Sequence, residues 1–480
     1  MRRRWRRTGV VFPPEAWARD GLAPLEVASR FGRLTLQRQM LATGVGTVHE
    51  AHATPGDAAL PPHGGLVITR GLQEMACLLP DTLPFVTAER LLGWQTQAAP
   101  EPVTAETVAP EPVTVPEAKR VLCASTLRTV VREHGAALAK AEWREVTRVR
   151  AALARGEGAT EGLCPRLVPA PAPRRRAGWP VALCAAVDQA LAAGETQPPR
   201  GVRVADWERV LVARRQERAD AGPEDLRRLG PEVGPDEVVA SADEVLTRRP
   251  QRRQFWELRT ARVATAEGYR YVSGTGATFL ATLAVLCALC QGTPAGGAPR
   301  QGVFLADGGR GLRDFYQATL APRGATLILD WYHLHHRCYQ VATQVCRDKP
   351  TRVRFLGTMG RLLWRGDVDG AIAAAAAFRP EAKAPPDPRR PAPLDEWITY
   401  LEARRASIPC YRERHRQRQY IGSGQAEKAN DLLVARRQKN KGMHWSEETS
   451  VALMRLRTLR LNGDWDRYWH QRQAPSLLAA

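Results

Sequence analysis

Three acidic residues combine suitable side-chain chemistry with positions that suit catalysis. Asp243 follows the apolar run VVASA, Asp307 follows VFLA, and Glu427 lies in the first turn of a helix that opens at the sequence GSG. Carboxylate oxygens are natural ligands of Mg²⁺, and a pair of such ions can activate an attacking oxygen and stabilise a leaving one. We therefore predict that these three acids bind two Mg²⁺ ions, for which Mn²⁺ can substitute.

Each acid by itself also has a simpler interpretation. An Asp directly after a strand is most often a turn former or a helix cap, and a Glu in a first helical turn interacts favourably with the helix dipole. Here the three acids occur together, in the element order described below, within a basic chain. This combination favours a metal site over three unrelated local roles.

The elements that must position these acids begin near Val238. Three runs are predicted to form an antiparallel meander, namely EVVASADEVLTRR, QFWELRTARVAT and GYRYVSG. Next come a helix over Ala277–Cys290, the buried strand GVFLADGG, a helix over Leu312–Leu320 and the buried strand in ATLILDWYHLHHR. The order β-β-β-α-β-α-β predicts an α/β fold with an RNase H-like core, whose mixed sheet has a parallel half. Ligands of such sheets gather at the carboxyl ends of strands.

Residues 341–407 are predicted to form an all-helical insertion in this core. The segment is rich in Ala and Pro, and it lies between the last predicted strand and the helix that carries Glu427. The core therefore divides into a first part over 236–340 and final helices over 408–470.

The region before the core is predicted to be mainly helical and to bind DNA. The sequence indicates a possible strand in GRLTLQRQML, a helix over Phe85–Gln97, and a Pro-rich linker over 98–118 in which APEPVT occurs twice. Residues 1–135 form one region, and a helical, Arg-rich connecting region follows over 136–235.

A short helix over Ser125–His134, with Ser125 as its cap, is predicted after the linker. Two short helices around a turn could form a helix-turn-helix in which Arg128 and Arg132 face DNA. The alternative is an amphipathic helix that buries three apolar residues, Leu127, Val130 and Val131. The sequence leaves both interpretations open.

The charge of the chain indicates a polyanionic partner. Its 480 residues contain 70 Lys and Arg against 50 Asp and Glu, a formal net charge of +20. Phosphate backbones are the commonest partners of such a surface, so we predict binding to double-stranded DNA rather than to a membrane. Between positions 404 and 441, eleven Lys and Arg stand against three acids, which indicates either a DNA track or a solvated charged face. The predicted DNA contacts are Arg128, Arg132, Arg310, Arg414, Arg416, Arg418, Lys428, Arg436, Arg437, Lys439 and Lys441.

The cysteines and the apolar segments indicate a cytoplasmic, nucleoid-associated protein. The nine Cys have no regular spacing, so no disulfide framework is expected. Cys287 and Cys290 lie inside an apolar run without a second pair nearby, which predicts two core residues rather than a zinc site. We expect neither a signal peptide nor a membrane-spanning segment.

Five segments resemble DDE transposases of bacterial insertion sequences, in particular those of ISKra-like elements and of the wider group shared with Mutator-like transposases. They span roughly 235–470 and occur in the family's order. They are SADEV at 241–245, FLADGGRG at 304–311, ILDWYHLHHR at 328–337, YIGSGQAEKAN at 420–430 and GMHWSEETSVALMRLRTLRLNGDWDRYW at 442–469.

This resemblance implies that Asp243, Asp307 and Glu427 are the DDE triad of an enzyme that acts as a homo-oligomer on DNA. The segment DWYH resembles a (C/D)-x-x-H motif, which would bring His333 near DNA or the scissile phosphate. The alternative is that His333 and His336 pack against the insertion. Asp236, Glu237 and Glu244 crowd the first acid; Asp243 is chosen because the apolar run ends there.

The resemblance implies hydrolysis at the ends of the element, followed by attack of the released 3′-OH on target DNA. This chemistry needs no protein nucleophile, so Ser423 is interpreted as a helix cap. Two other functions stay open: a transposase-derived DNA-binding protein that has lost its chemistry, and an RNase H-like nuclease that cuts without strand transfer.

Overall fold

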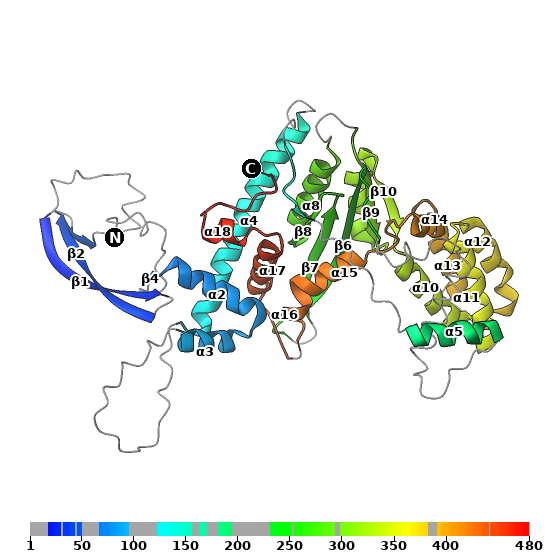
Figure 1. Ribbon diagram of the computed structural model, residues 1–480, viewed down its shortest axis with the longest axis horizontal. Helices are drawn as coiled ribbons and strands as arrows, with labels where there is room; N and C mark the ends of the chain where they lie inside the picture. The colour runs from blue at the N-terminus through cyan, green and yellow to red at the C-terminus, as the bar shows by residue number, and fades with distance from the viewer. Residues whose placement is uncertain are drawn as a thin grey trace, which may run out of the picture.

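The computed structural model describes twelve stretches of the chain. They are residues 18–29, 32–43, 46–49, 67–95, 122–155, 163–169, 181–193, 231–251, 254–292, 298–382, 391–440 and 442–479. A six-stranded sheet lies at the centre, with the helices α10–α14 on one side of it and the helices α2–α4 on the other (Figure 1). No helix within these stretches is long and apolar enough to cross a membrane. The APEPVT repeat lies outside them.

The central sheet has the strand order β10-β9-β6-β7-β8-β5. Strands β6, β7 and β8 are antiparallel neighbours, whereas β9 pairs parallel with β6 and β10 pairs parallel with β9. The predicted meander and the predicted parallel half are therefore confirmed. The short edge strand β5 is an addition that the sequence did not indicate. The bounds are β5 Val168–Pro169, β6 Glu237–Arg248, β7 Phe255–Ala264, β8 Gly268–Gly274, β9 Gln301–Ala306 and β10 Thr326–Leu329.

The alternation of side chains along β6 divides the core between two faces of the sheet. Val238, Ala240 and Ala242 pack against α8 (Gly276–Gln291), the predicted apolar helix, in which Cys287 and Cys290 are buried as expected. Val239 instead packs with the helices α10–α14, and Val245 packs with α15 and the turn that follows it. The face opposite α8 is thus shared by two groups of helices.

A group of helices follows β9 and β10. The helix α9 (Arg310–Phe315) continues in a π-helical turn over Tyr316–Leu320, which confirms the predicted helix there. The described residues of 341–407 are helical as predicted, but the first helix already begins at Trp331, because the carboxylate of Asp330 accepts a hydrogen bond from the backbone N–H of His333 and caps it. The bounds are α10 Trp331–Val345, α11 Lys349–Trp364, α12 Val368–Ala377, α13 Pro393–Glu402 and α14 Tyr411–Arg416.

The region before the core contains more helix than strand among its described residues, as predicted, but it also contains a sheet that the prediction did not include. It begins with a sheet of order β3-β2-β1-β4, in which only β2 coincides with a predicted strand. The long strand β1 contains Gly21 and Pro24 and a register shift between Arg19 and Leu22, and these features interrupt the alternating pattern that identifies a strand. The bounds are β1 Ala18–Ser29, β2 Gly32–Thr43, β3 Gly46–His49 and β4 Val67–Ile68, followed by the helices α2 Arg70–Thr82 and α3 Phe85–Gln95.

The helix predicted over 125–134 is the beginning of a single 31-residue helix, α4 (Ala124–Ala154). Its N-cap residue is Cys123 rather than Ser125, and no side chain caps it. Three apolar side chains are fully buried against α2, α3 and α17, namely Leu127, Val130 and Val131. The amphipathic interpretation is therefore confirmed. Arg128 and Arg132 lie outside this buried face, so their contact with DNA stays a prediction, but the helix that carries them is longer than the predicted short one. The connecting region contains one further described helix, α5 (Val181–Ala193).

The C-terminal helices join the sheet to the N-terminal helices. Trp445 and Trp469 are buried together with residues of α2, α3 and α4. The helices α4 and α17 cross closely at Gly135, where an added Cβ would come within 2.4 Å of the Ala452 side chain. The bounds are α15 Gly424–Asn430, a π-helical turn Asp431–Ala435, α16 Arg436–Gln438, α17 Glu447–Leu461 and α18 Trp465–Trp469.

Candidate functional site

The parallel pairing of β6 with β9 brings two of the predicted acids side by side. Ser241 of β6 is paired with Leu305 of β9. The same register, continued by two residues, sets Asp243 opposite Asp307. Alternate residues of a strand point to the same face, so both side chains point to the face that Val239 occupies, opposite α8. Adjacent strands lie about 4.8 Å apart.

The third acid reaches the same place through the helix α15. The amide of Asn430 donates a hydrogen bond of 2.6 Å to Oδ2 of Asp243, and its carbonyl oxygen accepts one from Thr260 of β7. Glu427 is one helical turn before Asn430, and residues three apart share a face of a helix. Its exposed carboxylate therefore lies on the side of α15 that is fixed to β6. We call Asp243, Asp307 and Glu427 the carboxylate cluster.

The electrostatics of the carboxylate cluster reflect this proximity. Burial raises the pKa of Asp243, and the negative charges of Asp307 and Glu427 raise it further, while a hydrogen bond from the backbone of Glu244 and the charge of His333 act against them. Carboxylates whose charges repel one another form a set that a divalent cation could neutralise. As they stand, however, no three His, Cys, Asp or Glu side chains among the described residues converge into a metal-binding group.

A fourth acid, Asp330, forms a buried junction beside the cluster. It follows β10, is fully buried, and accepts hydrogen bonds from the backbone N–H and the hydroxyl of Ser423. Nδ1 of His333 lies 3.4 Å from its other carboxylate oxygen. Burial favours the neutral acid, but the hydrogen bonds from His333 and Ser423 outweigh it and lower the pKa of Asp330 to about 2. The junction ties α10 to the loop before α15.

This junction determines the charge of His333. The close approach of its ring to the carboxylate of Asp330 raises the pKa of His333 to about 9 against the opposing effect of burial, and the charges of Asp307 and Glu427 contribute in the same direction. His333 is therefore a cation at neutral pH. Its side chain is 42 % exposed beside the carboxylate cluster, whereas His336 is exposed and bonds Gln340.

Two arginines and a tyrosine of the helical group also approach Asp307. Gly308 adopts a positive φ of 85°, and its carbonyl oxygen accepts a hydrogen bond of 3.2 Å from Arg404. The guanidinium groups of Arg404 and Arg337 lie 3.9 and 4.3 Å from the centre of the Tyr400 ring. Burial lowers the pKa of Arg404, and its Nε is buried without a hydrogen-bond partner. The sequence analysis missed this arrangement, because its three members lie on two helices and a loop end.

The basic residues predicted to contact DNA divide into two sets. The exposed ones are Arg128, Arg310, Arg416, Lys428, Arg436 and Lys439. Four others are less exposed and bind other parts of the protein: Arg132 pairs with Glu448, Arg414 donates to the carbonyl of Tyr420, Arg418 pairs with Glu232, and Arg437 donates to the carbonyl of Pro80. Lys441 lies outside the described residues.

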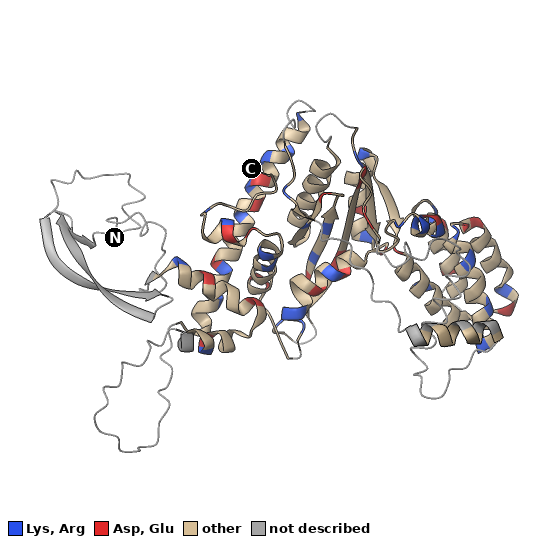
Figure 2. Cartoon of the chain, viewed as in Figure 1, with Lys and Arg blue, Asp and Glu red and all other residues tan. Residues whose placement is uncertain are grey.

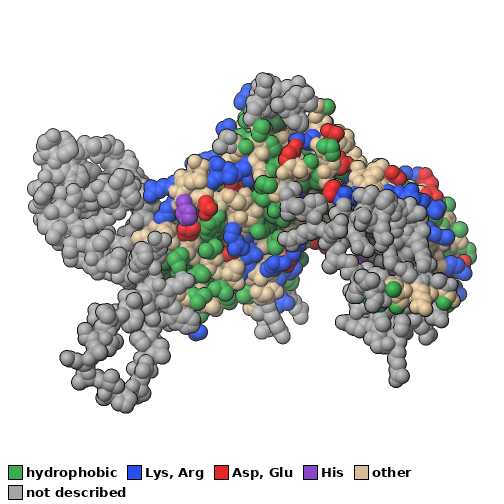
Figure 3. Space-filling model, viewed as in Figure 1, with side chains coloured by type: hydrophobic (Ala, Val, Ile, Leu, Met, Phe, Trp, Pro, Cys, Tyr) green, Lys and Arg blue, Asp and Glu red, His purple; other side chains and the backbone are tan. Residues whose placement is uncertain are grey.

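Arg437 is the clearest correction among these residues. It is 2 % exposed, its guanidinium lies 4.7 Å from the centre of the Trp445 ring, and burial lowers its pKa to about 10. It therefore supports the packing of α16 on α2 instead of facing DNA. Figure 2 shows basic residues on α14 and α16, and on the face seen in Figure 3 Lys and Arg are interspersed with Asp and Glu.

Ser423 has a role that differs from the predicted one. It occupies the N-cap position of α15, but its hydroxyl makes no capping hydrogen bond and donates instead to Asp330 at 2.7 Å. The side chain is buried and its proton is committed to a carboxylate that stays ionised. Ser423 is thus a structural link between α10 and α15.

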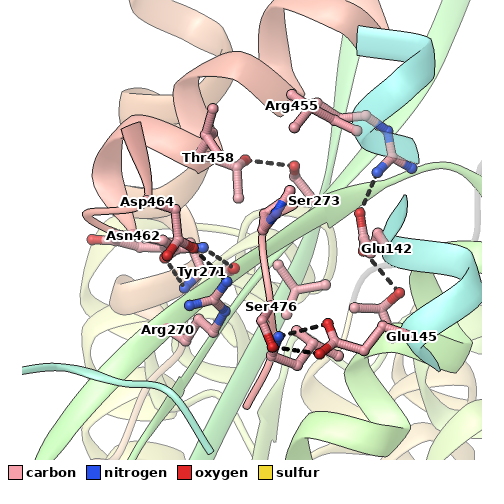
Figure 4. Close-up of a pocket in the computed structure, with 16 residues that line it drawn as sticks. Glu142, Glu145, Arg270, Tyr271, Ser273, Arg455, Thr458, Asn462, Asp464 and Ser476 are labelled. Carbon is pink, nitrogen blue, oxygen red and sulfur yellow. Dashed lines mark hydrogen bonds and ion pairs between the residues drawn. The ribbon is translucent and has the colours of Figure 1, made fainter. Parts of the chain in front are cut away.

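A further polar site on the sheet has a different character. Arg270 and Asp464 are both buried and lie 2.7 Å apart, Asn462 bonds the backbone of Tyr271, and Arg455 pairs with Glu142 of α4. Figure 4 shows these side chains pointing toward one another across a small pocket between β8, α4 and α17. We call Glu142, Arg270, Arg455, Asn462 and Asp464 the paired cluster. Its charges are matched, which indicates a structural role.

No protein-family model matches this chain, and no curated protein matches its sequence.

Proposed function

We propose that this protein is a DDE transposase, which binds insertion-sequence ends, cleaves DNA by metal-dependent phosphodiester hydrolysis and joins the released 3′-OH to target DNA. The observation that carries the proposal is that Asp243 and Asp307 occupy corresponding positions on neighbouring strands, while the helix that carries Glu427 is bonded to Asp243 through Asn430. The effect of Asp307 and Glu427 on the pKa of Asp243 is the electrostatic signature of that arrangement.

The element order supports an RNase H-like interpretation of the sheet. Three antiparallel strands are followed by a helix, a parallel strand, a helix and a second parallel strand, in the spatial order β8-β7-β6-β9-β10. The helices α10–α14 occupy the chain between β10 and the helix that carries Glu427. We interpret them as the all-helical insertion expected for this class of transposase.

The chain's own residues can perform distinct tasks at this site. Asp243, Asp307 and Glu427 would hold Mg²⁺ or Mn²⁺, which when bound supplies Lewis-acid activation of the attacking and leaving oxygens. The cationic His333 beside the cluster provides a charge for a phosphate oxygen, held in orientation by Asp330.

Arg404 and Arg337 add positive charge on the side of Asp307. Because Tyr400 and the carbonyl of Gly308 fix the Arg404 guanidinium, little side-chain freedom would be lost when it meets a phosphodiester. Nucleophilic catalysis by Ser423 is disfavoured, because its hydroxyl is buried against Asp330.

The experiment that tests this function is cleavage of a labelled duplex carrying the element's end, with Mg²⁺, with Mn²⁺ and with EDTA. Asp307→Asn keeps the size of the side chain and removes its charge. We expect cleavage to fall about 10²–10³-fold while DNA binding is retained, since one electrostatic group of an active site contributes about that much. Asp314→Asn, an exposed acid on the neighbouring helix α9, is the matched control and should cleave normally.

The same assay separates the alternatives. Cleavage that survives Asp307→Asn would show that the proposed triad is wrong. Salt-sensitive binding by the wild type without any cleavage would favour a DNA-binding protein that has lost its chemistry. Cleavage without joining to target DNA would favour the nuclease.

A further inference from the structure

A second cavity lies beside the carboxylate cluster and takes no part in the functions described above. Its volume is about 390 Å³, within the ~300–1,000 Å³ typical of small-molecule sites. Its walls come from β7, β8, the start of α10 and the first turns of α15. The lining side chains that matter here are Arg262, Tyr271, Tyr332, Tyr420, Gln425 and Lys428.

Tyr332 provides an aromatic surface at this cavity. Its side chain is 62 % exposed, which is unusual for a large ring beside a buried junction. The ring rests on the backbone of Gly422, where an added Cβ would come within 2.8 Å of the Tyr332 ring and 3.0 Å of Asp330. A glycine at this position therefore lets the ring lie against the loop, with most of its surface open to a ligand.

The charge of the lining indicates what the ligand is. Arg262 and Lys428 are basic, with Lys428 paired to Asp431 at 2.9 Å, and none of the described residues that line the cavity is acidic. Arg262 is held by a hydrogen bond to Gln425 and lies 4.3 Å from the centre of the Tyr269 ring, so its position is fixed. Lys428 directly follows Glu427 in α15, which brings the cavity next to the carboxylate cluster. An aromatic surface with fixed cations suits a flat ring that carries a phosphate.

We propose that this cavity binds an unstacked nucleotide of the DNA strand, with its base against Tyr332 and its phosphate near Arg262 and Lys428. The inference rests on the proposed function and deepens it, because a base held here would place the neighbouring phosphate beside Asp243, Asp307 and Glu427. Stacking on an aromatic side chain is tolerant of sequence, so the site would recognise an unpaired base rather than a particular one.

The test compares two fluorescein-labelled duplexes, one fully paired and one with a single unpaired nucleotide, by anisotropy with the full-length protein. The wild type should bind the bulged duplex about ten-fold more tightly, as expected for one stacked base. Tyr332→Ala should abolish this preference and Tyr332→Phe should keep it. Tyr339→Ala removes another exposed tyrosine of α10 that does not line the cavity, and it should behave as wild type.

A second measurement, photo-crosslinking, uses only the wild-type protein, so its result does not depend on whether a variant folds. A duplex with 5-iodouracil at the unpaired position should photo-crosslink to the wild type at Tyr332, which peptide mapping would identify. Equal binding of both duplexes, or a crosslink elsewhere, would overturn the cavity proposal while leaving the transposase proposal intact. Absence of binding to either duplex would overturn both.

Discussion

The paired cluster and the carboxylate cluster lie on the same sheet, but the first brings opposite charges together and the second brings like charges together. In the paired cluster Asp464 is 1 % exposed and meets two arginines, Arg166 at 2.9 Å and Arg270 at 2.7 Å. In the carboxylate cluster Asp243 has acidic neighbours, and its pKa is raised. A buried ion pair keeps each of its charges compensated, whereas neighbouring like charges cost stability. The comparison therefore distinguishes residues that stabilise the fold from residues whose charges are available to a ligand.

Removal of Asp464 should have the largest effect on stability. Asp464→Ala leaves Arg270, which is 4 % exposed, as an uncompensated buried charge, so we expect a loss of about 3–5 kcal/mol in the free energy of unfolding. Denaturant unfolding followed by circular dichroism measures this loss. Asp466→Ala, in a side chain that is 78 % exposed two residues away, should change stability little. Equal effects of the two substitutions would contradict the structural role of the paired cluster.

The carboxylate cluster should respond to metal, and the paired cluster should not. A ligand that binds only the folded state stabilises it by about 1.4 kcal/mol at ten times its Kd. We expect Mg²⁺ or Mn²⁺ to raise the thermal midpoint of the wild type but not that of Asp243→Asn. Asp236→Asn, an exposed acid just before β6, is the control that should keep the metal response. A response that survives Asp243→Asn would exclude this cluster as the binding site.

Without metal, Asp243→Asn should stabilise the protein slightly at neutral pH. A raised carboxyl pKa means that the folded state disfavours the ionised form, so the wild type carries a cost above that pKa. This cost disappears as the pH falls through the raised pKa of Asp243, and the advantage of the variant should shrink in the same range. Denaturant midpoints at several pH values measure the difference. A variant less stable than the wild type at every pH would show that Asp243 is structural.

The sequence predicted the parts of this arrangement that depend on local pattern. Asp243 and Asp307 follow runs of apolar residues that form neighbouring strands, and the register of those strands brings them together. The link between Asp330 and Ser423 was not predictable in this way, because the two residues are 93 positions apart and meet only through tertiary packing. Arg437 shows the opposite error: a run of basic residues indicated a DNA-facing surface, but packing on α2 buries this one.

His333 combines the two kinds of interaction, because it pairs with the buried Asp330 and also lies beside the carboxylate cluster. His333 forms an ion pair with Asp330, as a structural residue would, but its positive charge also interacts with the negative charges of Asp307 and Glu427. Its pKa of about 9 lies above the ordinary value of 6.5, so the stabilisation from its charged form is complete below pH 6.5 and is lost as the pH rises through about 9.

Imidazole NMR should find the His333 resonance titrating near pH 9, and Asp330→Asn should move it toward 6.5. If only the pairing with Asp330 matters, Asp307→Asn will leave the titration unchanged. A downward shift in Asp307→Asn would show that His333 senses the carboxylate cluster, as a residue positioned to meet a phosphate there should. Titration near 6.5 in the wild type would contradict both roles.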